Sequence, residues 1–133
     1  PHLSYTVLHD WDLDAVLEAL EDLPASDPFE LTFLGLGTFP RGRGWLAVPV
    51  GADLARRQAS VDAAVRTTRA SMHPHYAPGT WIAHCTVVPR VRLDDYGLFA
   101  AEVYPVLPLP VRVTASAVID SGIGQTWPLT HIV

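Results

Sequence analysis

The sequence contains no lysine and a single cysteine, Cys85, among its 133 residues. One cysteine cannot form an internal disulfide, and a zinc site built from cysteines is not expected. No apolar run approaches the roughly 18 residues that a membrane-spanning helix needs. The first residues, PHLSYTV, lack the basic and apolar stretches of a signal peptide. These absences indicate a reduced, cytoplasmic protein that does not enter a membrane.

Charged residues are also scarce, at 17% of the chain, whereas 49% of the residues are hydrophobic. This balance excludes a disordered chain, which needs low hydrophobicity and high charge. The length corresponds to about one typical domain. We therefore expect a single domain over residues 1–133 that behaves as a monomer.

The charge is distributed unevenly. The net charge of −5 argues against a protein that coats nucleic acid. Residues 10–30 hold eight acids and no base, and residues 41–92 hold eight of the nine arginines with only two acids. Two interpretations stay open: the arginines cover solvated helix faces, or the basic middle of the chain attracts a phosphate group.

Hydrophobic periodicity predicts both strands and helices. We expect helices at 13–23, 53–72 and 93–104, with Asp12 as the N-cap of the first helix and Pro24 after its end. The predicted strands cover 3–8, 29–36, 44–50, 81–88, 111–119 and 126–133. Hairpin turns, rather than regular βαβ spacing, connect several of them. This order predicts an α+β fold with antiparallel sheets.

One four-residue pattern, histidine followed two positions later by serine or threonine, occurs twice. It reads HLSY at 2–5 and HCTV at 84–87, 82 positions apart. Side chains at i and i+2 of a strand share one face, about 6.5 Å apart. Each copy would therefore place an imidazole beside a hydroxyl, His2 with Ser4 and His84 with Thr86. Two such strands could present both pairs to one cleft.

This pair of motifs suits phosphodiester chemistry. Histidine has an unperturbed pKa near neutral pH, so one ring can act as a base while the other acts as an acid. The hydroxyls would hydrogen-bond the non-bridging phosphoryl oxygens. A phosphodiester needs both functions, because a water must lose a proton and the leaving oxygen must gain one. The arrangement needs no metal and no cofactor.

Three stretches then resemble a known family. PHLSYTVL, FELTFLGLGTFPRGRGWLAVPV and YAPGTWIAHCTVV, in this order, resemble the two-histidine (2H) phosphoesterase superfamily, and most closely its 2′-5′ RNA ligase-like branch with its HxTx motif. The resemblance covers about residues 1–90. It implies a bilobal α+β fold, in which two antiparallel sheets with flanking helices surround a central cleft. That family also has a strand and a helix ahead of its first motif, so we expect this chain, which starts at Pro1, to lack them.

The resemblance implies that His2 and His84 are the catalytic pair and that Ser4 and Thr86 hold the phosphate. The predicted activity is that of a metal-independent hydrolase that opens 2′,3′-cyclic or related cyclic or 2′-5′ nucleotide phosphodiesters. The expected partner is a nucleotide or RNA terminus that carries a cyclic phosphate. Two alternatives stay open: a module that binds a nucleotide or RNA end without cleaving it, and a di-histidine metal site, which would lack a third ligand from either motif.

Several other residues are candidates for contact with the substrate. Phe39 and Tyr76 lie in expected loops beside the motif strands and could stack on a base or cap the cleft. Arg90 is an even number of positions from His84, so an extended strand would carry both side chains on one face, and Arg90 could contact a phosphate. Arg41 and Arg43 lie on an expected hairpin and could also contact a phosphate.

The remaining aromatic and histidine residues are interpreted as structural. Cys85, Tyr5 and Trp81 fall on the faces opposite the motif residues, and they are expected in the core together with Trp45 and Trp127. His73 and His75 are interpreted as surface loop residues rather than metal ligands, because no carboxylate or cysteine lies near them in the sequence.

Overall fold

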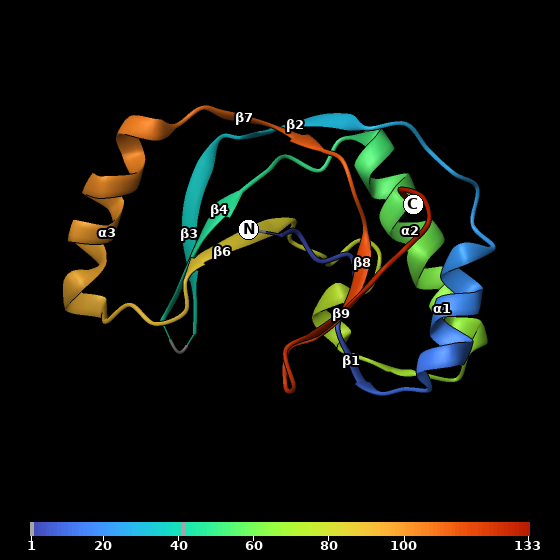
Figure 1. The fold of residues 1–133 in the computed structure, drawn as a ribbon. Coiled ribbons are helices and arrows are strands. Elements are labelled where there is room, and N and C mark those ends of the chain that lie inside the picture. The colour runs from blue at the N-terminus through green and yellow to red at the C-terminus, as the bar shows by residue number, and fades with distance from the viewer. Residues whose placement is uncertain (1, 41) are drawn as a thin grey trace. The chain divides into compact units, whose positions relative to one another are not determined.

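The computed structural model describes residues 2–40 and 42–133. Figure 1 shows a mixed fold of helices and short strands, as the sequence predicts. The helices are α1 (Leu13–Glu21), α2 (Ala52–Thr67) and α3 (Tyr96–Val103), with short 3-10 helices η1 (Pro74–Tyr76), η2 (Leu93–Asp95) and η3 (Tyr104–Val106). The strands are β1 (Leu8–Asp10), β2 (Phe29–Phe33), β3 (Gly35–Phe39), β4 (Arg43–Ala47), β5 (Ser71–Met72), β6 (His84–Val88), β7 (Leu109–Val113), β8 (Ala117–Asp120) and β9 (Gln125–Pro128).

The strands form several small sheets. β1 pairs with β5, β8 pairs with β9, and β3, β4 and β6 form a three-stranded sheet; all of these pairings are antiparallel. β2 and β7 form a further two-stranded sheet. The predicted α+β class with antiparallel sheets is therefore confirmed.

The chain divides into two compact units. Unit 1 contains the start of the chain through Ser4, Glu30–Val50 and Ile82–Val111. Unit 2 contains Tyr5–Phe29, Gly51–Trp81 and Arg112–Val133. Both histidine motifs thus have their histidine and hydroxyl residues in unit 1.

The sheet of unit 1 has one buried face. Leu46 of β4 pairs with Cys85 of β6, and these two side chains are 6% and 3% exposed. Phe99 of α3 packs closely against the same face, because a Cβ added to Gly44 would lie 2.8 Å from its ring. By strand alternation, the neighbouring residues of β4 and β6 point to the other face.

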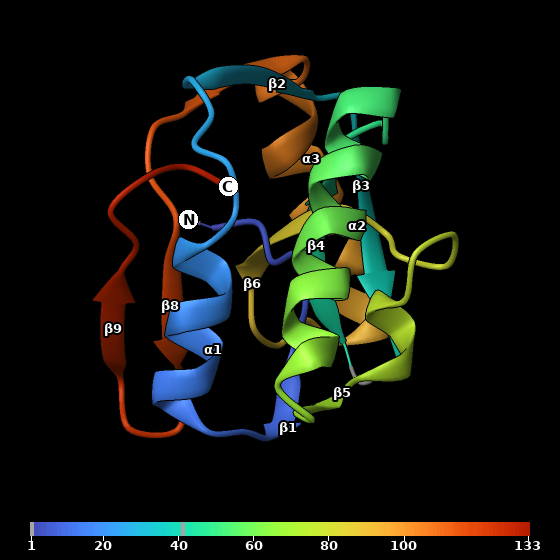
Figure 2. The ribbon, with the colours of Figure 1, turned by 90° about the vertical axis from the view of Figure 1, so that its right-hand side faces the viewer.

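Unit 2 is built around the contact between α1 and α2, which lie side by side in Figure 2. Their apolar faces meet in a core cluster of Val16, Leu20, Val61, Val65 and Val133. α1 begins where the sequence predicts, because the Asp12 carboxylate accepts a 3.0 Å hydrogen bond from the Ala15 amide.

Two predicted elements have bounds that differ from those the sequence suggests. The helix predicted at 53–72 ends at Thr67, because Arg69 takes a left-handed backbone conformation (φ 63°) and Ser71–Met72 then pair with β1. The strand predicted at 3–8 is wrong: residues 2–7 have no strand, and β1 starts only at Leu8. A side chain partly replaces the missing strand partner, since the Gln58 amide donates to the Tyr5 carbonyl at 3.4 Å.

Other predicted strands are split or shortened. Residues 29–36 form two strands separated at Leu34, because β2 pairs with β7 and β3 pairs with β4. Residues 111–119 divide between β7 and β8 for the same reason, and the last predicted strand is confined to β9. The helix predicted at 93–104 is present as η2, α3 and η3 in succession.

Gln58 offers a test of how the start of unit 2 is held. Its side chain is 2% exposed and donates to two carbonyls, those of Tyr5 and, at 2.6 Å, Tyr76. Gln58→Leu removes both of these hydrogen bonds, so we expect it to lower the free energy of unfolding by about 1–3 kcal/mol in urea denaturation. Ser60→Ala, at an exposed site of the same helix, should change it by less than about 0.5 kcal/mol. Equal stability of Gln58→Leu and the wild type would contradict this role.

Candidate functional site

The second histidine motif lies on β6, as predicted. Cys85 is buried, while His84 and Thr86 project to the opposite face of the strand. The pairing with β4 places Ala47 beside His84 and Trp45 beside Thr86. The predicted alternation is therefore confirmed for this motif: one imidazole and one hydroxyl share the face of the sheet that does not carry Leu46.

Aromatic rings surround the His84 imidazole on this face. The Phe39 ring stands edge-on to it with the centroids 4.8 Å apart, and the Trp45 ring lies 5.9 Å away. Phe39 and Trp45 also contact each other at 4.9 Å. Gly37, which pairs with Trp45, makes the arrangement possible, because a Cβ there would lie 2.4 Å from the indole ring.

The position of Trp45 corrects its assignment to the core. It is half-buried and lies on the same face of β4 as Arg43 and Ala47, whereas Gly44 and Leu46 are buried on the other face. The alternation in the RGWLA sequence could have predicted this position. Trp45 was instead assigned to the core because tryptophan generally prefers the interior.

One hydrogen bond determines which nitrogen of His84 can exchange a proton. Nδ1 lies 2.7 Å from the carbonyl oxygen of Ile82. A carbonyl oxygen only accepts, so Nδ1 carries the hydrogen and donates it. The neutral ring then has its lone pair on Nε2.

The first motif is not on a strand. His2 is exposed and Ser4 is half-buried, and the irregular backbone at 2–7 removes the strand geometry on which their shared face was predicted. The segment through Ser4 nevertheless belongs to unit 1, together with β6. The structure therefore corrects the local conformation of this motif.

The arginine candidates differ in their placement. Arg43 pairs with Phe39 across the hairpin and is exposed on the site face of β4. Arg90 lies beyond the end of β6, and a bulge makes Val88, rather than Val87, the partner of Gly44. The bulge adds one residue to β6. The even spacing between His84 and Arg90 therefore no longer places their side chains on the same face of the strand. Arg41 lies outside the described residues.

Tyr76 lies in unit 2, within η1. Its ring meets the His73 ring edge-on at 5.8 Å, and its carbonyl accepts from Gln58. His84 and its neighbours Phe39 and Trp45 belong to unit 1. Contact between Tyr76 and a substrate therefore stays a prediction.

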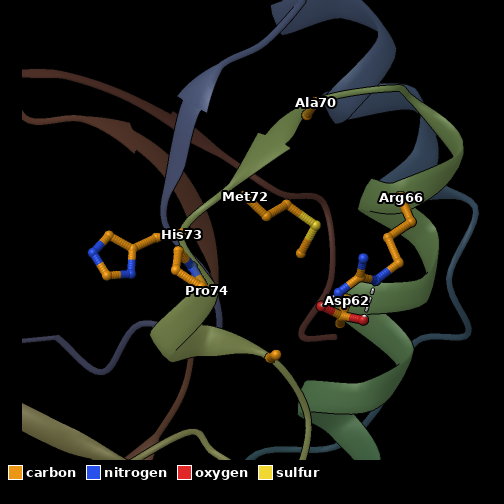
Figure 3. A pocket seen from close by; sticks show the side chains of 7 residues that line it. Asp62, Arg66, Ala70, Met72, His73 and Pro74 are labelled. Carbon is orange, nitrogen blue, oxygen red and sulfur yellow. Dashed lines mark hydrogen bonds and ion pairs between the residues drawn. The ribbon is translucent and has the colours of Figure 1, made fainter.

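All three arginines of α2 have acidic partners on the same helix. Asp53 pairs with Arg56 and, at 2.8 Å, with Arg57, whose hydrogen bond lowers the pKa of the Asp53 carboxyl below its usual value. Arg66 pairs with Asp62 through two hydrogen bonds of 2.7 and 3.1 Å. Figure 3 shows this pair at one side of a pocket that Met72 and Pro74 also line. These pairs neutralise much of the positive charge of α2.

Arginines that are not paired on α2 remain in both units. Among the described residues of 41–92, Arg43 and Arg90 in unit 1 and Arg69 in unit 2 are exposed and have no ion-pair partner. Arg92 of unit 1 has only a 3.8 Å contact with Asp94, and both side chains are largely exposed. The sequence analysis had grouped all arginines of residues 41–92 together. The structure separates them into the paired arginines of α2, the accessible arginines of unit 1 and Arg69, which is exposed after the end of α2.

Three histidines of unit 2 lie close together. The His73 ring is 5.2 Å from the His9 ring and 4.8 Å from the His75 ring. Burial, followed by the charges of His75 and His9, lowers the pKa of His73. Within residues 2–40 and 42–133, no group of three or more His, Cys, Asp or Glu side chains could hold a metal ion.

Comparison with known proteins gives one match. The model of the 2′-5′ RNA ligase superfamily matches residues 1–123. No curated protein and no solved structure matches the chain. None of the helices in the described part of the chain has the length and apolar character needed to cross a membrane.

The two best-defined imidazoles should be opposite tautomers. His84 donates from Nδ1, whereas Nδ1 of His73 accepts a 3.2 Å hydrogen bond from the His75 amide and must leave its hydrogen on Nε2. We expect ¹⁵N chemical shifts near pH 8 to show the Nδ1–H form for His84 and the Nε2–H form for His73. The Nε2–H form at His84 would contradict the geometry of the site.

The environment of His73 also predicts a pH dependence of stability. Its folded-state pKa is lowered, so the unfolded chain binds more protons just below the ordinary His value of about 6.5. Stability should therefore fall as the pH drops from about 6.5 through the lowered pKa. We expect His73→Gln to lose less unfolding free energy than the wild type between pH 7 and pH 5 in denaturant titrations. The two proteins should show parallel behaviour above pH 7.5, and parallel loss below pH 6.5 would refute the prediction.

Proposed function

The chain belongs to the 2′-5′ RNA ligase superfamily, which is the 2H phosphoesterase superfamily, and on this basis we propose a specific reaction for it. Membership supports phosphoesterase-type chemistry. We propose that the protein is a metal-independent phosphodiesterase that opens a 2′,3′-cyclic phosphate, or a related cyclic or 2′-5′ phosphodiester, of a nucleotide or RNA terminus. The observation that carries the proposal is the common face of His84 and Thr86, with the His84 ring already oriented by Ile82 and Phe39.

The proposed reaction uses two imidazoles in opposite protonation states. A neutral histidine accepts a proton from water as the water oxygen bonds to phosphorus. A protonated histidine donates its proton to the ribose oxygen as the bond between that oxygen and phosphorus breaks. His84, through Nε2, can serve in either role, and His2 is proposed for the other.

The hydroxyls are proposed to stabilise the charge on the phosphoryl group. Thr86 lies two residues from His84 on the same strand face, where its hydroxyl can donate to a non-bridging oxygen. Ser4 is proposed for the same role in the first motif. Arg43, which is exposed on this face of β4, is proposed to attract the anion.

The division of the chain into two units supports the catalytic role proposed for His2. The segment through Ser4 joins the unit of β6, whereas the residues that follow belong to unit 2. In both ribbon views the beginning of the chain runs near β6 (Figures 1 and 2). The second catalytic imidazole would then come from the same compact unit as the first.

One observation favours the alternative function, a module that binds a nucleotide or RNA end without cleaving it. His2 is exposed on a segment without strand structure, and such a side chain is less firmly positioned than His84. A binding protein would need Thr86, Arg43 and the rings beside them, but not an ordered second histidine. Product formation distinguishes the two functions, because the phosphodiesterase converts its ligand and the binding module does not.

Removal of either histidine tests the catalytic assignment. We expect His84→Ala and His2→Ala each to lower kcat for 2′,3′-cyclic nucleotides, assayed with EDTA, by about 10²–10⁴-fold. His75→Ala, at an exposed residue of unit 2, is the matched control and should retain wild-type activity. Unchanged turnover in His84→Ala would reject the assignment, and tight binding with no product in the wild type would establish the binding module instead.

The two protonation states predict the pH dependence of the reaction. Because one imidazole must be neutral and the other charged, we expect a bell-shaped profile of kcat/KM between pH 5 and pH 9. Each limb should be lost in the variant that lacks the corresponding histidine, to the extent that residual activity can be measured. A flat wild-type profile over this range would argue against the two-histidine mechanism.

A further inference from the structure

A pocket of about 490 Å³ lies in unit 2, between the second half of α2 and residues 70–77. Asp62 and Arg66 of α2 line one side, and Met72 and Pro74 lie across from them (Figure 3). This volume is within the range of about 300–1,000 Å³ that is usual for small-molecule sites. The reaction proposed above uses none of the residues that line the pocket, which is therefore a candidate site for a different ligand.

The Asp62–Arg66 pair differs from an ordinary ion pair on a helix surface. The Asp62 side chain is only 7% exposed, whereas that of Asp53, which pairs with Arg56 on the same helix, is 49% exposed. A buried carboxylate loses its hydration, and an ion pair compensates for that loss only with good geometry. The Asp62 oxygens accept hydrogen bonds of 2.7 and 3.1 Å from Nε and Nη2 of Arg66. These two bonds fix the plane of the guanidinium.

Arg66 keeps hydrogen-bond donors for a ligand. A guanidinium has five N–H groups, and Asp62 takes one on Nε and one on Nη2. In residues 2–40 and 42–133, no other side chain pairs with Arg66. The edge between Nη1 and Nη2 therefore stays available, and its fork geometry matches two oxygens of a carboxylate or a phosphate. Because the Arg66 side chain is 57% exposed and lines the pocket, a ligand can reach this edge.

The other wall of the pocket is apolar. It is formed by Ala70, Met72, Pro74 and Ala77. Figure 3 shows the Met72 side chain extending toward the Asp62–Arg66 pair, while the His73 ring points away from the pocket. A methionine side chain adapts its shape to the group beside it. This wall suits an apolar ligand body next to the polar group that Arg66 would bind.

We propose that this pocket binds a small ligand in which an oxyanion, either a carboxylate or a phosphate, is attached to an apolar body. The oxyanion accepts hydrogen bonds from Nη1 and Nη2 of Arg66, and the apolar body lies against Met72 and Pro74. Because the Asp62–Arg66 pair is neutral at long range, the affinity comes from the hydrogen bonds of the fork and not from net charge. The inference does not depend on the proposed reaction, because all of these residues belong to unit 2.

The methyl group of Met72 provides the test. Met72 is the only methionine of the sequence, so labelling methionine methyl groups with ¹³C gives one NMR signal that reports on the pocket. The probes are benzoate, phenyl phosphate and benzyl alcohol, which has the ring but no oxyanion. We expect the anions to shift the signal saturably and benzyl alcohol to bind at least about 10-fold more weakly. Saturation by one anion alone would support the inference and identify the oxyanion. Equal affinity for all three compounds would overturn it.

Two matched pairs of variants locate the binding site. Arg66→Lys keeps the charge beside Asp62 but has no fork, so we expect anion affinity to fall about 10–100-fold. Arg56→Lys, at an exposed position of the same helix, should leave the affinity unchanged. Ala77→Leu fills the pocket and should abolish the shift. Ala63→Leu, at an exposed position of α2 outside the pocket, should retain it.

The outcomes separate this inference from the proposed function. Anion binding that neither Arg66→Lys nor Ala77→Leu weakens would overturn the inference, and if one of these variants fails to fold by circular dichroism, the other decides. We expect His84→Ala to bind both anions as the wild type does. Loss of anion binding in His84→Ala, with the pocket variants unaffected, would also overturn the inference. Unchanged turnover in His84→Ala would reject the phosphodiesterase and leave the pocket as proposed.

Discussion

The pairing of β4 with both β3 and β6 is the constraint on which the candidate site depends. Residues of a strand alternate between two faces, so a slip of one position would exchange Cys85 for His84 on the buried face. That slip would expose the thiol and bury an imidazole against Phe99. The apolar Leu46–Cys85 pair therefore determines the direction of the histidine. Apolar packing on one face of the sheet therefore directs the side chains of His84 and Thr86 to the other face.

The same sheet also limits the motion of the imidazole. The ring has an aromatic neighbour edge-on, Phe39, a second one in Trp45, and a carbonyl acceptor two residues before it in the chain. Gly37 contributes by having no side chain, because any Cβ would displace the indole. A side chain held from several directions loses little further freedom when a substrate binds. Local order of this kind favours an acid-base group whose geometry exists before the reaction.

The accuracy of the sequence analysis depends on where the information about each segment lies. The strand and the alternation of the second motif were predicted correctly, because alternation is local and this strand has a partner in β4. The first motif was predicted as a strand from composition alone, yet strand formation requires a partner, and a side-chain amide from α2 takes part of that role at Tyr5. The expected parity of Arg90 with His84 was wrong for another reason: the bulge at Val87 depends on the partner strand and leaves no signal in the sequence of β6 itself.

Turns and ion pairs required the structure for similar reasons. A helical pattern continued through Arg69, but the left-handed backbone at this residue ends α2 and frees the next residues to pair with β1. Counting charges along the chain gave one basic segment, whereas the i to i+4 spacing of Asp62 and Arg66, and the similar pairing at Asp53, divide it. That spacing is visible in the sequence. The strength of each ion pair, however, depends on which side of the helix is exposed.

The division of the charges bears on the size of the ligand. With a net charge of −5, the chain as a whole repels a polyanion, and affinity for long nucleic acid depends on many phosphate contacts. The accessible arginines of unit 1 are few, and the neutralised arginines of α2 add little to attract an extended strand. A short ligand with one phosphate needs only a local field, which Arg43 can supply on the face of His84. The electrostatics therefore favour a nucleotide or a chain end over the body of an RNA.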